Sequence, residues 1–395
     1  MNTKKHILII SSELYQTGLQ PLGGIFQRHE AELLNKNGYQ VGVLSVGIIT
    51  PRYLFKNTAT PLWEVCNGVN IIRKYKQTFI PNRINQSNSA RDLFISYGLE
   101  CYVKYVDKFG CPDVIHAHNL KYASLLAYEI KLKFGISYII TEHSSSFIRY
   151  KREADNLGLF MKAIRAADCF STVSRSLADS INEIVESRNL GSIENTTILY
   201  NLLDYELLKY VKNNVLNLNK HEPFTFINVA SLDDNKNQII ILKAFESKFK
   251  GKPFSLKIVG SGKNLKFLRK MANKLGIDEQ VSFLGHLSRG SLFQEFKSSN
   301  CFVLSSKVET FGVVLIEAAA FGLPLISTRC GGPEEIVNKS NGLLVENDNA
   351  EVLAQAMLAI AQNYYEYDKF NIQKSALKKY GGSDYLDVIR GIFNS

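Results

Sequence analysis

The sequence predicts an α/β protein with two doubly wound, Rossmann-like domains, each a parallel sheet with helices on both faces. Short apolar runs alternate with longer helical patterns along the whole chain, which is typical of parallel sheets. The alternation starts afresh after a polar, asparagine-rich stretch between residues 200 and 224. The length of 395 residues suits two or three domains. We therefore expect a first domain over residues 1–205 and a second over residues 206–375.

In the first half, five apolar runs are expected to be buried strands. A glycine turn follows the first run and leads into a helix expected over residues 26–38, which ends at Gly38. The expected strands cover residues 6–11, 39–46, 113–118, 138–143 and 169–174.

The second half repeats this pattern, with helices expected over residues 238–249 and 313–322. The expected strands cover residues 224–231, 255–262, 281–285, 301–306 and 324–328. Ligands of open parallel sheets bind at the carboxyl ends of the strands. With two such sheets, we expect the site in a cleft between those ends.

Composition narrows the class of protein. The net charge of +10 is spread over both halves rather than gathered in a stripe, which argues against a nucleic-acid partner. No apolar run approaches the roughly 18 residues of a membrane span, and the N-terminal run is too short for a signal peptide. The six cysteines are scattered, without a CxxC pair or a histidine cluster at zinc spacing. We therefore expect a cytoplasmic protein with reduced thiols and no structural metal.

The stretch RKYKQTFIPNRINQSNSAR, residues 73–91, combines basic and aromatic side chains. Arg73, Lys74 and Lys76 surround Tyr75 at its start. Two interpretations remain open: a solvated basic surface, or a contact with an anionic membrane face that makes the protein peripheral to the inner membrane surface.

Three motifs of the first half follow expected strands or lie at their ends. Gly23 and Gly24 precede a helix, where the backbone can approach a ligand, although a plain turn explains them equally well. His118 ends the strand of the HAHN motif, and His143 follows the next strand in TEHSS. One such histidine is usually structural, but two at neighbouring strand ends favour a functional role.

In the second half, Lys236 lies between a strand and a helix N-terminus, where it can meet a phosphate; a surface lysine is the alternative. Glu309 follows a strand, and Gly312 begins a helix whose dipole favours an anion. Glu317 lies inside this otherwise apolar helix and needs partners. Ligand hydroxyls would suit it, and a salt bridge between helices is the alternative.

Taken together, these motifs resemble a known family. The order of the Gly-Gly loop, HAH, TEH, NLLD, Lys236, IVGSG, FLGH, ETFGVVLIEAAAFGLPLI and GGPEEIV is similar to the retaining GT-B glycosyltransferases of the glycosyl transferases group 1 family. The resemblance covers nearly the whole chain. It implies GT-B architecture, with two domains facing across a cleft, and a C-terminal helix over residues 376–395 that packs back on the first domain.

The resemblance also implies an activity and its substrates. Members move a sugar from a nucleotide diphosphate donor, UDP- or GDP-linked, with retention and without a tightly bound metal or other cofactor. A hexose-type donor sugar is expected. The lack of a spanning run, the net charge of +10 and the basic–aromatic stretch suggest a glycan or lipid-linked glycan as the acceptor, as in surface polysaccharide, lipopolysaccharide or capsule biosynthesis, and a soluble acceptor is the alternative. The first domain would hold the acceptor, near His143, Arg73, Lys74 and Lys76.

Residue by residue, the resemblance assigns the second domain to the donor. Glu317 matches the residue that binds the ribose, Glu309 the one that faces the donor sugar, and Lys236 the diphosphate lysine. His118 matches the histidine that lies against the donor sugar. The remaining matched donor-binding positions are Gly23, Gly24, Ser231, Gly260, Thr310, Phe311, Gly312 and Val313.

One departure from the family pattern concerns the diphosphate. The family commonly has an arginine where this chain has Ser231, so one cation is missing or is supplied by another residue. The chain contains no Asp-x-Asp motif, which agrees with metal-independent transfer.

Three other classes of protein were weighed against this interpretation. A glycosidase uses paired carboxylates on opposite sides of a sugar, which does not suit a carboxylate inside a helix. A nucleotide-sugar epimerase shares the architecture but would use other catalytic acids. A catalytically silent nucleotide-sugar-binding subunit is the third alternative, and Ser231 is the argument for it.

Overall fold

The computed structural model describes residues 4–15, 23–49, 62–77, 88–144, 154–216 and 221–394. The chain divides into two compact units. Unit 1 comprises Met1–Val173, Leu177–Leu202 and Leu386–Ser395, and unit 2 comprises Ser174–Ser176 and Leu203–Tyr385. The division lies close to the expected boundary at residue 205, and the C-terminal segment of unit 1 begins at Leu386 rather than at residue 376.

Unit 1 is built on an eight-stranded sheet in the order β3-β4-β2-β1-β5-β6-β7-β8. Neighbouring strands are parallel, except that β3 and β4 form an antiparallel hairpin. The strands are β1 (His6–Ser11), β2 (Gln40–Ile49), β3 (Trp63–Cys66), β4 (Val69–Gln77), β5 (Val114–His118), β6 (Tyr138–Glu142), β7 (Cys169–Thr172) and β8 (Thr197–Ile198).

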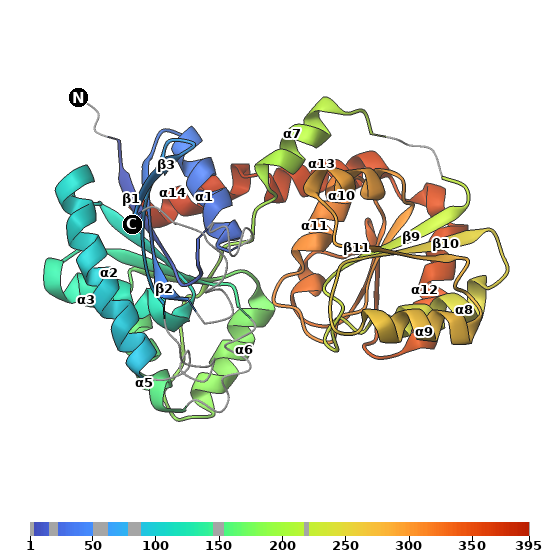
Figure 1. The fold of residues 1–395 in the computed structure, drawn as a ribbon, viewed down its shortest axis with the longest axis horizontal. Coiled ribbons are helices and arrows are strands. Elements are labelled where there is room, and N and C mark those ends of the chain that lie inside the picture. The colour runs from blue at the N-terminus through green and yellow to red at the C-terminus, as the bar shows by residue number, and fades with distance from the viewer. Residues whose placement is uncertain are drawn as a thin grey trace. The chain divides into compact units, whose positions relative to one another are not determined.

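Helices lie on both faces of this sheet. One face carries α2 and α3, and the other carries α1 and α14 (Figure 1). The helices are α1 (Ile25–Lys36), α2 (Asn88–Phe109), α3 (Leu125–Phe134), α5 (Ala154–Ala166), α6 (Arg175–Glu186) and α14 (Ser383–Asn394), with a π-helical turn at Leu120–Ser124. The helices α6 and α14 each begin within unit 2.

Unit 2 has a six-stranded parallel sheet in the order β11-β10-β9-β12-β13-β14. Phenylalanines fill much of its core: the Phe226 ring packs 5.2 Å from Phe249 and 5.0 Å from Phe224. The strands are β9 (Phe224–Val229), β10 (Phe254–Val259), β11 (Val281–Gly285), β12 (Cys301–Leu304), β13 (Leu325–Thr328) and β14 (Gly342–Val345).

The helices of unit 2 also form two layers. One layer contains α8, α9 and α12, and the other contains α10, α11 and α13 (Figure 1). The helices are α7 (Tyr205–Asn213), α8 (Gln238–Phe249), α9 (Leu265–Leu275), α10 (Arg289–Lys297), α11 (Val313–Ala320), α12 (Ala350–Gln362) and α13 (Lys369–Tyr380), with 3₁₀ turns at Gly332–Glu335 and Tyr364–Glu366. The prediction of two doubly wound α/β sheets is therefore confirmed.

Arg73, the first residue of the basic segment, is buried and does not belong to an exposed surface. Arg73 is only 3% exposed because it lies in β4; its Nε donates to the Tyr15 carbonyl at 3.0 Å, and its guanidinium pairs with Glu64. Lys74 pairs with Glu100 on α2. The side chain of Lys76 and residues 78–87 lie outside the described residues. Of the helices in the described ranges, none has the length and apolar character needed to span a bilayer.

Arg289 joins three helices of unit 2. Its guanidinium lies 2.9 Å from the Glu317 carboxylate on α11 and pairs with Asp204, the residue that precedes α7. Asp204 also accepts a hydrogen bond from the Leu207 amide at 2.6 Å and so caps α7. The salt bridge between helices, the alternative considered for Glu317, is therefore present, and Arg289 was not among the predicted residues.

This ion pair affects how Glu317 titrates. Burial raises the pKa of Glu317 above its usual value, and the neighbouring Arg289 partly offsets that rise. The stability that comes from a raised carboxyl pKa is present below the unfolded pKa and is lost as pH rises through the folded one. Removing Arg289 raises the folded pKa further, so the resulting defect must grow with pH.

We predict that Arg289→Met lowers the free energy of unfolding by about 3 kcal/mol at pH 8, because two buried carboxylates lose their cation. The loss should be smaller at pH 5. Urea unfolding at both pH values measures it. Arg329→Met is the matched control, because its pair with Glu334 is exposed and should contribute less than about 1 kcal/mol. Equal losses for the two variants, or a loss independent of pH, would contradict the prediction.

Candidate functional site

The glycine loop of unit 1 precedes α1. Gly24 has φ = 64°, and a Cβ atom there would lie 2.8 Å from the Tyr15 ring, so the position requires glycine. The Gly24 amide donates to the Glu13 carboxylate at 2.8 Å, and Gly23 lies in the preceding turn. The loop is thus held against the segment that follows β1.

The two predicted histidines of unit 1 are in direct contact. His118 is the last residue of β5, His143 follows β6, and their ring nitrogens Nδ1 and Nε2 are 2.8 Å apart. The Phe26 ring stacks parallel to His143 at 5.6 Å. Burial lowers the pKa of His118, and burial together with His118 lowers the pKa of His143 to about 3. Both imidazoles are therefore neutral near pH 7.

Glu30 is a site residue that the sequence did not reveal. It lies on α1, is 2% exposed, and its two carboxylate oxygens lie 2.6 Å from His116 and 2.8 Å from His118. A glutamate on the buried side of an amphipathic helix was the only signal. Among the described residues, Glu30, His116 and His118 are also the one group that could offer three metal ligands.

In unit 2, the loop after β9 carries Lys236 and Ser231. The Ser231 hydroxyl donates to Asp233 at 2.7 Å, and Asp233 accepts from the Lys236 amide at 3.1 Å. Gly260 follows β10 directly. A serine that binds a neighbouring carboxylate therefore occupies the position where the resemblance expects an arginine.

Lys236 and Glu309 are brought together. The Lys236 ammonium pairs with Oε1 of Glu309, and the Ser306 hydroxyl donates to the same oxygen at 2.7 Å. The two side chains are 22% and 14% exposed. The backbone of Glu309 is fixed by hydrogen bonds to Cys330 and Gly332. The lysine is thus held beside the loop that enters α11.

The segment after Glu309 leads into the amino end of α11. Gly312 has φ = 96°, a left-handed conformation, and Val313 begins the helix. The Leu315 amide donates to the Gly312 carbonyl at 2.9 Å, and the first-turn amides before it, with the helix dipole, make this end of the helix favourable for an anion. Phe311 is buried against Tyr380, and the Thr310 carbonyl accepts from Ser174 at 2.6 Å. Glu317 lies one turn further along and is bound to Arg289.

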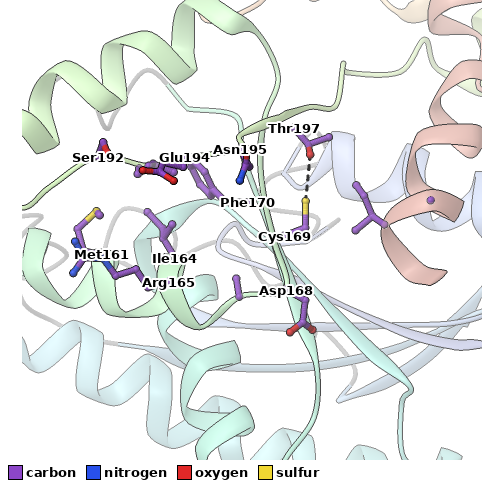
Figure 2. Close-up of a pocket in the computed structure, with 14 residues that line it drawn as sticks. Met161, Ile164, Arg165, Asp168, Cys169, Phe170, Ser192, Glu194, Asn195 and Thr197 are labelled. Carbon is purple, nitrogen blue, oxygen red and sulfur yellow. Dashed lines mark hydrogen bonds between the residues drawn. The ribbon is translucent and has the colours of Figure 1, made fainter. Parts of the chain in front are cut away.

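A separate pocket lies in unit 1 and involves none of the predicted residues. This cavity has a volume of about 490 Å³ and is lined by residues of α5, the start of β7, the segment that leads into β8, and α14 (Figure 2). Cys169, the first residue of β7, donates to Thr197 at 3.5 Å across it. The pocket is therefore at the amino end of β7, whereas His118 and His143 lie at carboxyl ends.

Comparisons with known proteins agree with this architecture. The family model described as Glycosyl transferases group 1 matches residues 212–376, and the one described as Glycosyltransferase Family 4 matches residues 27–204. An uncharacterized glycosyltransferase of Haemophilus influenzae is 25% identical over 368 residues, which cover 92% of this chain and 93% of that protein. Glycogen synthase of Mycobacterium tuberculosis is 24% identical over 355 residues, 86% of this chain and 82% of that protein.

Solved structures show the same fold. Sucrose-phosphate synthase from Thermosynechococcus elongatus superposes with a TM-score of 0.74 at 20% identity, covering 99% of this chain and 98% of that one. Anabaena HepE in complex with UDP-glucose gives 0.65 at 16% identity, with 98% and 99% covered. The lipopolysaccharide outer core galactosyltransferase WaaB gives 0.67 at 16% identity, with 98% of each chain covered. The chain therefore belongs to the glycosyl transferases group 1, Family 4, a retaining family of GT-B glycosyltransferases.

Proposed function

We propose that the protein moves a hexose-type sugar from a nucleotide diphosphate donor to a glycan or lipid-linked glycan, with retention and without a metal ion. The observation that carries this proposal is the arrangement at the amino end of α11. There Lys236 meets Glu309 beside the segment that leads into this helix end, and Glu317 lies one turn further along. The cation and the amino end of the helix suit a diphosphate. The two carboxylates suit the hydroxyls of the sugar and of the ribose.

In the proposed reaction, the acceptor hydroxyl attacks the anomeric carbon while the bond to the diphosphate oxygen breaks. The hydroxyl proton passes to the departing diphosphate, on the same face of the sugar. Lys236 and the amides that begin α11 stabilise the negative charge that grows on the diphosphate. Glu309 orients the sugar hydroxyls, and Glu317 accepts hydrogen bonds from the ribose. His118 contacts the donor sugar from unit 1.

The nucleotide is proposed to be UDP or GDP. HepE binds UDP-glucose, which supports a uridine donor, and this chain shares its fold. Ser231 leaves the diphosphate with one cation fewer than the family pattern provides, so donor binding depends more heavily on Lys236. The same serine favours a second candidate, a nucleotide-sugar-binding subunit without transferase activity. Release of nucleotide diphosphate from a panel of UDP- and GDP-sugars, with acceptor present, separates the two.

The acceptor is proposed to be a growing surface glycan on a lipid carrier at the inner face of the membrane. The net charge of +10 and the similarity to WaaB support this. Arg73 does not contribute to membrane contact, because it is buried. Lys74 and Lys76 remain the candidates for it in this segment.

We predict that Glu317→Ala raises the KM for the donor by about 10- to 100-fold, because charge-assisted hydrogen bonds to ribose are each worth about 1.5–3 kcal/mol. The kcat should change less. Initial rates over a donor series measure both constants. Glu351→Ala, an exposed change on α12, should leave both unchanged. An unaltered donor KM in folded Glu317→Ala would remove Glu317 from the donor site.

Chelation tests the metal-free part of the proposal. We expect the rate of transfer to survive excess EDTA, because Lys236 and the α11 amides supply the positive charge. Rates are measured with and without EDTA, and again after adding Mg²⁺ or Mn²⁺. Complete loss of activity that either cation restores would show that a metal takes part.

Membrane contact is tested by co-sedimentation with neutral or anionic vesicles at low and high salt. We expect binding to anionic vesicles that weakens with salt, because exposed basic residues contribute roughly 1 kcal/mol each at such a surface. Lys74→Ser with Lys76→Ser should reduce it. Lys263→Ser with Lys266→Ser, an equal loss of charge in unit 2, is the control. Equal and negligible binding to both vesicle types would overturn the membrane proposal and leave the transferase proposal in place.

A further inference from the structure

A continuous chain of polar side chains runs through unit 1 at the carboxyl ends of β5 and β6. Its centre is Glu30, the only carboxylate in the chain of contacts. Its members, in order, are Ser171, Thr141, His116, Glu30, His118, His143 and Asn201.

On one side of Glu30, the contacts run through His116. Oε1 of Glu30 lies 2.6 Å from Nδ1 of His116. The other ring nitrogen, Nε2, lies 2.7 Å from the Thr141 hydroxyl, which is 2.6 Å from the Ser171 hydroxyl. Both hydroxyls can rotate to donate or to accept. This arm is therefore compatible with a hydrogen on either ring nitrogen of His116.

On the other side, the contacts run through His118. Its Nε2 lies 2.8 Å from Oε2 of Glu30, although the N–H direction is not aligned well enough for a linear hydrogen bond. Its Nδ1 lies 2.8 Å from Nε2 of His143, and Nδ1 of His143 lies 2.9 Å from the Asn201 amide. Each ring nitrogen of His118 and His143 thus lies within 2.9 Å of a polar atom of unit 1.

The charge of Glu30 fixes where the ring hydrogens lie. Burial raises the pKa of Glu30, but His116 and His118 lower it by more, so the net pKa is well below its usual range and the group is ionised. A carboxylate only accepts hydrogen bonds, so Nδ1 of His116 and Nε2 of His118 must each carry a hydrogen.

The remaining hydrogens follow in sequence. The neutral His118 ring then has a bare Nδ1, so His143 must donate from Nε2. His143 in turn has a bare Nδ1 that needs a donor from Asn201. We therefore assign the amide nitrogen of Asn201, rather than its oxygen, to the position that faces His143; the two atoms are interchangeable in such assignments. Along this arm, each ring therefore carries its hydrogen on the nitrogen that is nearer to Glu30 in the order of contacts.

We propose that Glu30 is a positioning residue that fixes the tautomers and ring orientations of His118 and His143, with Asn201 closing the chain. Glu30 also links two predicted parts of the site, because α1 begins at the Gly23–Gly24 loop and carries this carboxylate to the end of β5. The effect on catalysis rests on the proposed function, in which His118 contacts the donor sugar. The tautomer assignment does not rest on the proposed function.

The tautomers can be observed directly in the wild-type protein by NMR of ¹⁵N-histidine at pH 7. We expect the hydrogen on Nδ1 in His116 and on Nε2 in His118 and His143. The Nδ1 form is the less common one for a neutral imidazole, so His116 gives a distinctive signal. Rings are assigned with single histidine variants. His118 as an Nδ1–H tautomer or as an imidazolium would overturn the proposal. The proposal would also be overturned if elemental analysis found bound zinc and if neither Nδ1 of His116 nor Nε2 of His118 carried a hydrogen.

Two variants test the chain of contacts, one at its Asn201 end and one at its centre, Glu30. Asn201→Asp replaces the amide donor with an acceptor, so His143 must carry its hydrogen on Nδ1 and His118 must take up a second proton to satisfy both neighbours. We expect an imidazolium signal for His118 at pH 7 in this variant. Unchanged tautomers of both rings would show that they do not depend on this chain.

Glu30→Gln tests the consequence for transfer. It should lower kcat by about 10- to 100-fold, the range typical of losing a group that orients a functional histidine, with a smaller change in donor KM. Glu32→Gln, on the same helix and hydrogen-bonded to Asn67, is the matched control and should keep the wild-type kcat. A wild-type kcat in Glu30→Gln would overturn the positioning role. If the wild-type protein transfers no sugar at all, the proposed function fails, while the NMR result still decides the tautomers.

Discussion

A buried carboxylate must have a partner, and this constraint shapes the candidate site in both units. Glu30 and Glu317 are buried and Glu309 is partly exposed, and each of the three carboxylates has a different partner. Glu30 lies between two imidazoles, Glu309 pairs with a lysine and accepts from a serine hydroxyl, and Glu317 pairs with an arginine that it shares with Asp204. These partners hold the backbone elements that carry them in fixed positions. The side chains that define the site therefore also hold together its local structure.

The partners differ in how readily a ligand can displace them. Lys236 and Glu309 are partly exposed, so an arriving diphosphate would compete with Glu309 for the lysine and leave the glutamate free to accept sugar hydroxyls. Glu317 would retain Arg289, so its charge would stay paired while the remaining lone pairs of the carboxylate could accept hydrogen bonds from a ligand. The unliganded ion pairs therefore preserve charges that binding requires, at a cost that the ligand must offset.

Much of the fold was predictable from local patterns. The expected strand over residues 6–11 is β1 without change, and the helix over residues 238–249 is α8. These succeed because a buried parallel strand is apolar throughout and a helix has its own period. The β3–β4 hairpin was missed because β4 carries the basic residues Arg73 and Lys74, which suggested a surface segment. Burial of Arg73 depends on Glu64 and Tyr15, which only the folded chain brings near.

Some residues of the candidate site could also be predicted from the sequence, and others could not. Positions at strand ends, such as His118 and Lys236, follow from topology and could be named from the sequence. Glu30 and Arg289 could not, because each acts through a partner distant along the chain: Glu30 through His116 and Arg289 through Glu317. No local pattern distinguishes a helix glutamate that reaches a histidine from one that reaches solvent. Partner choice is a tertiary property.

The placement of α14 has a consequence for the order in which the units can mature. Its residues from Leu386 onward belong to unit 1, although the whole of unit 2 beyond residue 203 precedes them in the chain. Ile389 is fully buried there, and the Phe393 ring packs against Tyr39 at 6.2 Å. During synthesis on the ribosome, unit 1 therefore leaves the exit tunnel first, but it cannot complete its core until the segment from Leu386 onward has been made. Unit 2, nearly continuous in sequence, can complete its core earlier, so the half made first is the half finished last.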